Sequence, residues 1–362
     1  MRVLHVIARL NVGGTARYIT QLANELPKYG VETFVATGFV QGSEVEDPSA
    51  QSIDVIRIPA LGRSINPIKD HLARKQLEKI IADIKPDIIH THTFKAGYIT
   101  RIKKQQIPVV HTFHGHLLDD PEFSGFKSKV IIQIEKMLAK KSAKLVTVGQ
   151  IVGQELLQHN IGREDQYVSI APGVVALDIT ARTQALKNLG ITDTGKPIIG
   201  WIARMTGVKN PMRALDVAKI IPDTHFIMAG GGDLLEDVKA AAPSNVSAIG
   251  WAQAEDLFGA ADIILSTSDN EGMPVALIEA QLAGKPVVAT DVGSVSEVIA
   301  NHETGLVTNS NPNSIAAAVN TLILDTQKHT AMSTLAASRA QSLFSVDRMI
   351  NAHVDLYKSI VK

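Results

Sequence analysis

The sequence contains no cysteine among its 362 residues. This absence excludes disulfide bonds and thiolate metal sites, and it fits the reducing conditions of the cytoplasm. The chain also lacks any run of about 18 apolar residues, so no segment is predicted to span a membrane. Aromatic residues make up only 4%, whereas single-stranded nucleic acid is usually bound on aromatic stacking platforms. We therefore expect a cytoplasmic protein without a nucleic-acid partner.

The chain has no net charge, because 36 basic residues balance 36 acidic ones. The charges are nevertheless unevenly distributed. Residues 1–172 contain 22 lysines and arginines against 17 acidic residues, whereas residues 173–362 contain 14 against 19. An excess of about five positive charges in the first half indicates that this half meets something anionic.

Short β-branched runs alternate with amphipathic stretches along the whole chain. The strand-like runs are 3–8, 31–37, 54–58, 87–90, 109–112, 145–148, 168–170, 198–202, 225–229, 246–249, 263–266 and 287–290. Helical stretches lie between them, for example 16–26, 67–84 and 127–140. Nearly continuous apolar strands that alternate with helices predict an α/β protein with parallel sheets covered on both faces.

The length predicts about two domains. The strand at 168–170 runs into Pro172-Gly173, a turn that marks the boundary. We therefore expect two Rossmann-like domains at residues 1–172 and 173–345, followed by an amphipathic C-terminal helix at 346–362.

The segment from Asp269 to Ala280 leaves a predicted strand, turns at Gly272 and enters a helix, with Pro274 suited to its first turn. The start of such a helix presents free backbone N–H groups to an anion. Glu271 precedes the helix and Glu279 lies two turns into it, roughly 12 Å away at 1.5 Å per residue. This spacing suits the two ends of a nucleotide sugar better than a glycosidase carboxylate pair. The alternative is one helix-dipole glutamate and one surface glutamate.

Arg204 and Lys209 follow the predicted strand at 198–202. The carboxyl end of such a strand faces the crevice where α/β sheets bind ligands, and two cations there would neutralise a diphosphate. The alternative is that both side chains are solvated surface charges.

Glycine-rich loops follow strands in both halves, at Gly13-Gly14 and at 230–232. Adjacent glycines allow a backbone to approach a phosphate closely before a helix begins. The spacing of the dinucleotide motif G-x-G-x-x-G is absent, and a plain tight turn remains the alternative in each case.

Histidines cluster in the first half, at His90, His92, His111, His114 and His116. Alternate residues of a strand face one side, as metal ligands would. Because no carboxylates accompany them at ligand-like spacing, we predict no metal site. We expect His114 to form hydrogen bonds in the ligand cleft, and the other histidines to be structural.

Six lysines lie between Lys127 and Lys144, interleaved with apolar residues. A basic amphipathic helix of this kind can lie on an anionic membrane. The first interpretation is therefore peripheral contact with the inner face of a membrane. The second is a solvated helix face.

Together, these segments resemble the retaining glycosyltransferases of family 4, the group-one glycosyltransferases. Glu271 and Glu279 match the E-x7-E motif of that family. Arg204 and Lys209 match its G-R-x4-K pair, although Ala203 replaces the usual glycine.

The rest of the chain carries the resemblance from Gly13-Gly14 to a predicted turn at 305–307. His114 matches the histidine of the family's first domain. The loop at 230–232 is similar to the family's G-x-G turn, with Gly231 where an aspartate is common. This departure puts a polar contact with the nucleotide in doubt.

The resemblance implies the GT-B fold, in which two Rossmann-like domains face each other across a cleft and the C-terminal helix returns to the first domain. It also implies a retaining, metal-independent transfer of a sugar from a nucleotide diphosphate sugar, with UDP as the default. The donor is then a co-substrate, and no cofactor is needed. The acceptor would be a glycan, a lipid-linked molecule or a small molecule in polysaccharide or glycolipid assembly.

The resemblance also implies roles for individual residues. Glu279 would hold the ribose hydroxyls, and Glu271 would hold the donor sugar. Arg204 and Lys209 would stabilise the departing diphosphate. The other expected donor contacts are Gly13, Gly14, His114, Gly231, Gly272, Met273 and Pro274.

Three other functions remain open at this point. An epimerase on a similar scaffold would need acid and base groups on both sides of the sugar. A phosphorylase would usually carry a pyridoxal lysine on a much longer chain. A non-catalytic subunit that binds sugar nucleotides would not need the complete set of charged residues.

Overall fold

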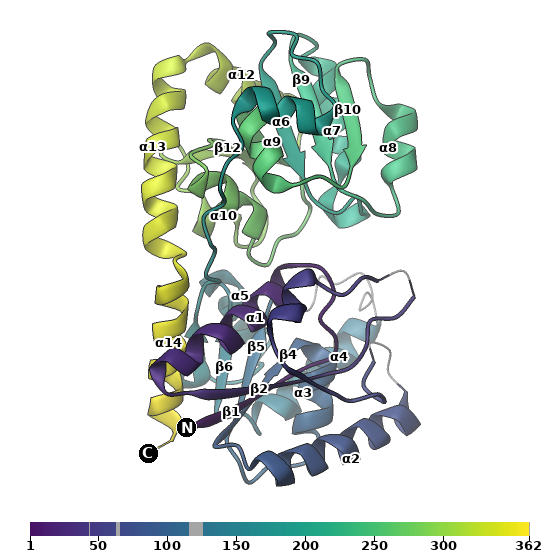
Figure 1. Ribbon diagram of the computed structural model, residues 1–362, viewed down its shortest axis with the longest axis vertical. Helices are drawn as coiled ribbons and strands as arrows, with labels where there is room; N and C mark the ends of the chain where they lie inside the picture. Colours follow the sequence, from purple (N-terminus) through teal and green to yellow (C-terminus); the bar gives the residue numbers. More distant parts are fainter. Residues whose placement is uncertain (43, 63–65, 116–125, 362) are drawn as a thin grey trace. The chain divides into compact units, whose positions relative to one another are not determined.

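The computed structural model describes residues 1–362 except 43, 63–65, 116–125 and 362. The chain forms two compact units (Figure 1). The first comprises Met1–Gly173 together with Val346–Lys362, and the second comprises Val174–Ser345. Gly173 thus lies in the first unit, one residue beyond the boundary expected from the proline–glycine turn.

The first unit is built on a parallel sheet of seven strands in the order β3-β2-β1-β4-β5-β6-β7. The strands are β1 (Arg2–Ile7), β2 (Glu32–Thr37), β3 (Val55–Arg57), β4 (Ile88–His92), β5 (Val109–Phe113), β6 (Lys144–Thr147) and β7 (Tyr167–Ser169). The helices are α1 (Gly14–Glu25), η1 (Leu26–Tyr29), η2 (Pro48–Ser52), α2 (Pro67–Ile84), α3 (Thr93–Arg101), α4 (Phe126–Ala139), α5 (Gln150–Gln158), η5 (Glu164–Gln166) and α14 (Val346–Ile360).

Both faces of this sheet are covered. Val3 and Ile7 of β1 pack in one apolar cluster with residues of α1 and with Met349 and Ile350 of α14. The alternate residues of β1 pack in a second cluster with α2 and α3. Because helices cover both faces, every residue of β4 and β5 is buried, as the continuous apolar runs predict.

The second unit is a parallel sheet of six strands in the order β10-β9-β8-β11-β12-β13. The strands are β8 (Ile198–Ile202), β9 (His225–Ala229), β10 (Val246–Gly250), β11 (Ile263–Ser266), β12 (Val287–Thr290) and β13 (Gly305–Thr308). The helices are α6 (Arg182–Leu189), η6 (Gly207–Lys209), α7 (Pro211–Ile220), α8 (Leu235–Ala241), α9 (Ala254–Ala260), α10 (Val275–Leu282), α11 (Val295–Val298), α12 (Pro312–Leu324) and α13 (Thr326–Leu343).

The expected α/β class with two parallel sheets is confirmed, and the predicted strands are displaced by at most two residues at either end. One prediction is wrong: the supposed turn at 305–307 lies in β13, which pairs with β12 in parallel. Within the described residues, no helix is long and apolar enough to cross a membrane.

The strand order reverses between β1 and β4 in the first sheet, and between β8 and β11 in the second. In open parallel sheets, ligands bind beyond the carboxyl ends of the strands at such a switch point. The loops that follow these strands therefore define the candidate site in each unit.

Candidate functional site

The loops after β8 and β11 are tied together at the switch point of the second unit. The indole N–H of Trp201 donates to the Thr267 hydroxyl at 3.0 Å, and that hydroxyl donates to the carbonyl of Asn210 at 2.9 Å. The backbone N–H of Asp269 donates to the carbonyl of Val208 at 2.8 Å. These bonds hold the segments that carry Lys209 and Glu271 in a fixed relation.

Lys209 and Glu271 form an ion pair in which both carboxylate oxygens are used. Nζ of Lys209 lies 2.6 Å from Oε1 and 2.7 Å from Oε2 of Glu271. The hydroxyl of Ser268 donates to the same Oε1 at 2.6 Å. The Lys209 side chain is 23% exposed and that of Glu271 is 9% exposed. Glu271, which is expected to bind the donor sugar, therefore fixes the orientation of Lys209, which is expected to bind the diphosphate.

Arg204 is different, because its side chain is exposed. In the part of the chain that the structure describes, no group pairs with its guanidinium. The neighbouring Arg213 instead binds the carboxylate of Asp269 at 2.6 Å and the carbonyl of Thr267 at 2.7 Å. Arg204 is thus a cation whose charge the folded unit leaves available.

Helix α10 begins one residue later than expected, with Pro274 at its N-cap and no side chain capping it. The first backbone N–H groups of a helix have no partner inside it, so this end presents donors next to the half-buried Gly272 and Met273. Glu279 lies within the helix and is only 9% exposed. The alternative of a surface glutamate at this position is therefore excluded.

The glycine loop after β9 packs closely on its surroundings. A Cβ at Gly230 would collide with the carbonyl of Ala203, and one at Gly231 would collide with the indole of Trp251. Trp251 itself follows β10 and is 69% exposed. The indole occupies the space that a larger residue at 231 would need, which gives a physical reason for the glycine at this position.

In the first unit, Gly13 is the N-cap of α1 with φ of 147°, a conformation that favours glycine. Its backbone N–H donates to Oδ2 of Asp47 at 3.2 Å, and Asp47 is 3% exposed. Gly13 and Gly14 are themselves exposed. Asp47 is not apparent as a site residue from the sequence, because it follows β2 by ten residues rather than ending that strand.

His114 lies just after β5 and is held on two sides. Nε2 of His114 is 3.0 Å from Nδ1 of His92. Its ring also meets the ring of Tyr18 edge-on, with centroids 5.0 Å apart. Burial, and to a lesser extent the nearby His353, lowers the pKa of His114 to about 3. The imidazole is therefore neutral at physiological pH.

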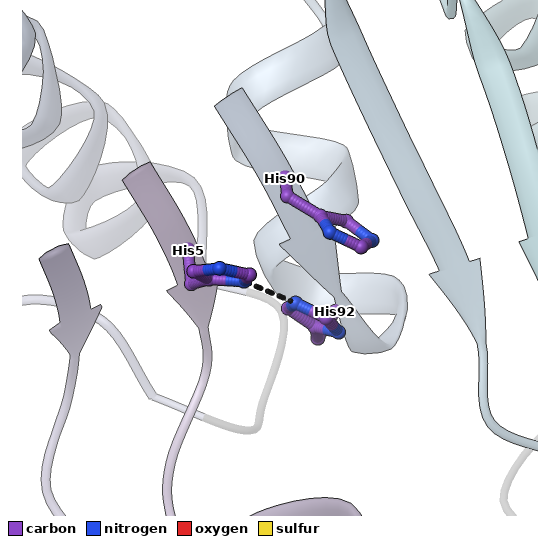
Figure 2. A group of neighbouring side chains, drawn as sticks. All are labelled: His5, His90 and His92. Atoms are coloured by element: carbon purple, nitrogen blue, oxygen red, sulfur yellow. Dashed lines mark hydrogen bonds between the residues drawn. The ribbon is translucent and has the colours of Figure 1, made fainter. Parts of the chain in front are cut away.

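Three further histidines of the first unit lie close together (Figure 2). His5 on β1, which the sequence analysis did not include, joins His90 and His92 on β4, with possible ligand nitrogens within 4.8 Å of one another. His5 shares a face of β1 with Val3 and Ile7, and it lies opposite His90 in the β1–β4 register. His116 lies outside the described residues.

Comparison with known proteins identifies the chain. The profile of the family "Glycosyltransferase Family 4" matches residues 12–175, and that of "Glycosyl transferases group 1" matches residues 184–339. The two profiles together cover most of both units. The chain belongs to the group 1 glycosyltransferases. The match shows an enzyme family, and it disfavours the epimerase and phosphorylase alternatives.

The chain also aligns with individual proteins over most of its length. The chain is 26% identical to UDP-Gal:alpha-D-GlcNAc-diphosphoundecaprenol alpha-1,3-galactosyltransferase of Escherichia coli, over 86% of this chain and 85% of that protein. Sucrose-phosphate synthase of Thermosynechococcus elongatus superposes with a TM-score of 0.85 at 18% identity, covering 99% of both chains. HepE of Anabaena in complex with UDP gives a TM-score of 0.80 at 20% identity, covering 99% of this chain and 100% of that one. These structures show the GT-B fold for this glycosyltransferase.

Proposed function

We propose that this glycosyltransferase moves a sugar from a UDP-linked donor to an acceptor with retention of the anomeric configuration and without a metal ion. The observation that carries the proposal is the second-unit site, where Lys209 is preoriented by Glu271 and Arg204 has no partner among the residues that the structure describes. Two cations at a switch point can neutralise a diphosphate. The UDP donor named for the E. coli relative and the UDP bound in the HepE structure support the choice of nucleotide.

In this proposal each site residue binds a particular part of the donor. Glu279 binds the ribose hydroxyls, and Glu271 binds the donor sugar with the backbone around Gly272, Met273 and Pro274. The backbone of Gly231, in the loop after β9, contacts the nucleotide. Gly13, Gly14 and His114 supply the contacts from the first unit.

The chemistry needs no protein base. As the bond between the anomeric carbon and the diphosphate breaks, the acceptor oxygen attacks the same face of the sugar. Its proton passes to a phosphate oxygen of the leaving group. The negative charge on the diphosphate grows along this path, and Arg204 and Lys209 stabilise it most at the transition state.

Thermal unfolding with a panel of nucleotides tests the donor assignment. A ligand that binds only the folded state stabilises it by RT ln(1 + [L]/Kd), which is about 2.7 kcal/mol at 100-fold saturation. We expect UDP and UDP-sugars to raise the melting temperature in the presence of chelator, and GDP and ADP to raise it much less. A larger shift with GDP or ADP would contradict the choice of UDP.

Activity is expected to survive removal of divalent metal. The reason is that Arg204 and Lys209 occupy the place where a metal-dependent enzyme would bring Mg²⁺ to the diphosphate. Transfer rates measured with EDTA and with added Mg²⁺ or Mn²⁺ should agree. Activity that is lost in EDTA and returns only with the metal would contradict the proposal.

For the acceptor, we favour a lipid-linked glycan at an anionic membrane, consistent with the diphosphoundecaprenol acceptor named for the E. coli relative. In the structure, some lysines of the lysine-rich stretch are already engaged and are not available to a membrane. Nζ of Lys141 donates to the carbonyl of Ile102 and that of Lys144 to the carbonyl of Asp165, and Lys136 is half-buried. Lys129 and Lys140 remain exposed.

The exposed face of α4 also carries apolar groups. Val130 and Met137 are each 41% exposed, and they line a shallow groove with Lys129, Gln133 and Ile134. Apolar side chains flanked by lysines are the pattern of a helix that lies in a membrane interface. We therefore expect fewer lysines to contact the membrane than the six that the sequence contains in this stretch.

Liposome flotation tests this surface. The wild-type protein should float with anionic vesicles, and the binding should weaken with salt, because screening acts within about 8 Å at physiological ionic strength. The double substitution Lys129→Glu with Lys140→Glu should reduce it, since each lysine contributes about 1 kcal/mol. The matched control is Lys75→Glu with Lys79→Glu, which makes the same charge change on exposed residues of α2. Equal flotation with neutral vesicles, or an equal loss in the control, would remove the membrane contact.

A further inference from the structure

Three buried histidines of the first unit, His5, His90 and His92, lie on one face of its sheet. His5 is opposite His90 in the β1–β4 register, and Ile7 is opposite His92. All three imidazoles are fully buried. They face α1 and α14, whose side chains Tyr18, His353 and Tyr357 pack against them.

Hydrogen bonds link three of the histidines in a row that ends at His114. Nδ1 of His5 lies 3.1 Å from Nε2 of His92 (Figure 2). Nδ1 of His92 lies 3.0 Å from Nε2 of His114. His92 therefore uses both ring nitrogens within the row, and His114 uses one.

All members of the row are neutral. Burial lowers the pKa of His5 to about 3, and that of His114 to about 3. Burial also lowers the pKa of His92 well below its usual range, with smaller contributions from His90, His114, His5 and His111. A neutral imidazole carries one proton, so each ring donates through one nitrogen and accepts through the other.

The surroundings of His5, at one end of the row, determine which ring nitrogen of each histidine carries the proton. Nε2 of His5 is buried and has no partner among the described residues. Orphaned buried N–H groups are rare in native structures, so we assign the proton of His5 to Nδ1. His5 then donates to His92, and His92 donates through its Nδ1 to Nε2 of His114. The proton of His114 is thereby placed on its Nδ1.

From this row we infer that His92, supported by His5, is a positioning residue that fixes the tautomer and ring orientation of His114. Nδ1 of His114 then presents an N–H, for which no described residue offers an acceptor, to an oxygen of the donor sugar. The inference rests on the proposed function in that the sugar is taken as the partner of this N–H. Tyr18, which meets the His114 ring edge-on, restrains the same ring from the side of α1.

A metal ion is a poorer explanation of the cluster. Both nitrogens of His90 are already engaged, with the Tyr357 hydroxyl at 2.6 Å and with the Thr112 hydroxyl at 2.6 Å. Both nitrogens of His92 are engaged as well. Zinc bound at about 2.0–2.1 Å by all three rings would have to break several of these bonds.

Substitution of His92 tests whether this residue fixes the tautomer of His114. His92→Leu removes both hydrogen bonds of the row. His92→Asn keeps an amide near the position of Nδ1 and can still donate to His114. The matched controls are His111→Leu and His111→Asn, because His111 is also buried but is bonded to the Thr91 hydroxyl at 2.8 Å, outside the row.

The first readout is the ¹⁵N spectrum of histidine-labelled protein without ligand, which reports the protonated nitrogen of each ring. We expect a single Nδ1–H tautomer for His114 in the wild type, in the His111 variants and in His92→Asn, and a mixture in His92→Leu. An unchanged His114 tautomer in His92→Leu would overturn the inference. If His92→Leu does not fold, His5→Leu tests the same row, and a mixed His92 tautomer is expected there.

The second readout is turnover of the folded protein. Loss of the outer hydrogen-bond partner of a metal-bound histidine typically costs about ten- to a hundredfold. We expect kcat/KM to fall by a similar factor in His92→Leu, less in His92→Asn and little in the His111 variants. A shifted tautomer with unchanged kcat/KM would overturn the role of the row in catalysis. If the wild type transfers no sugar, the proposed function fails, while the spectrum still decides whether His92 controls His114. One equivalent of Zn²⁺ that shifts His5, His90 and His92 together would favour a metal site instead.

Discussion

Replacing Arg204 by alanine is expected to lower kcat by about a hundred- to a thousandfold, which is the effect of losing one donor at a developing negative charge. The side chain is exposed and unpaired within the described part of the protein, so its removal breaks no contact that supports the fold. The free energy of unfolding should therefore stay within about 0.5 kcal/mol of the wild type. Steady-state kinetics and denaturant unfolding measure the two quantities.

The matched control for Arg204 is Arg213→Ala. Arg213 lies nine residues further along the chain, in the first turn of α7, and its guanidinium binds Asp269 and the carbonyl of Thr267. We expect its loss to reduce stability more than Arg204→Ala does. An Arg204 variant with normal kcat would show that this guanidinium is only a surface charge, the alternative that the sequence leaves open.

Lys209→Met is expected to lower kcat by a similar factor of about a hundred to a thousand, with a much smaller change in the dissociation constant of the donor. The charge on the diphosphate is largest when the glycosidic bond is breaking, so Lys209 acts mainly on the transition state. Unlike Arg204, it also supports the structure, because Glu271 is nearly buried and both its carboxylate oxygens accept hydrogen bonds from Lys209. Leaving this carboxylate without the cation should cost about 1–3 kcal/mol of stability.

The double variant Lys209→Met with Glu271→Gln separates the two effects. Removing both charges relieves the unpaired carboxylate, so the double variant should be more stable than Lys209→Met alone. Turnover should not recover, because neither the cation nor the carboxylate is present. Recovery of kcat together with stability would mean that Lys209 serves only the fold, and normal kcat with weakened donor binding in Lys209→Met would mean that it acts in the ground state.

The pattern of apolar strands was enough to predict most of the fold. Most of the sheet strands are short runs of largely buried residues between helices, and helices on both faces make parallel pairing the favoured arrangement. The exception is β13, where Gly305 and the brevity of the run resemble a turn. Only its pairing with β12 distinguishes it from one, and a pairing between distant segments is not visible in local sequence.

The candidate site residues could be selected from the sequence, but the contacts between them could not. Arg204, Lys209, Glu271 and His114 could each be selected from their positions after strands. The ion pair between Lys209 and Glu271 joins residues 62 apart in sequence, and it exists because β8 and β11 are neighbours in the sheet. No spacing rule along the chain predicts that neighbour relation.

The same limit explains what the sequence analysis missed. Asp47 reaches Gly13 from a loop 34 residues away, and His5 reaches His92 across 87 residues. Of the six lysines near α4, two bind backbone carbonyls of other segments. The sequence shows only that such residues are charged or that they lie near others of their kind. Their tertiary contacts determine which of them remain available to a ligand.

The most direct test of the central claim is proton NMR of UDP-sugars incubated with the purified protein in EDTA, without an acceptor. Such a transferase should pass the sugar slowly to water. We expect release of UDP from at least one UDP-sugar. We also expect the first free sugar to have the anomeric configuration of the donor, and the release to be about a hundred to a thousand times slower in Lys209→Met. Release of the opposite anomer, or no release from any nucleotide sugar even with Mg²⁺ and an acceptor lipid present, would contradict it.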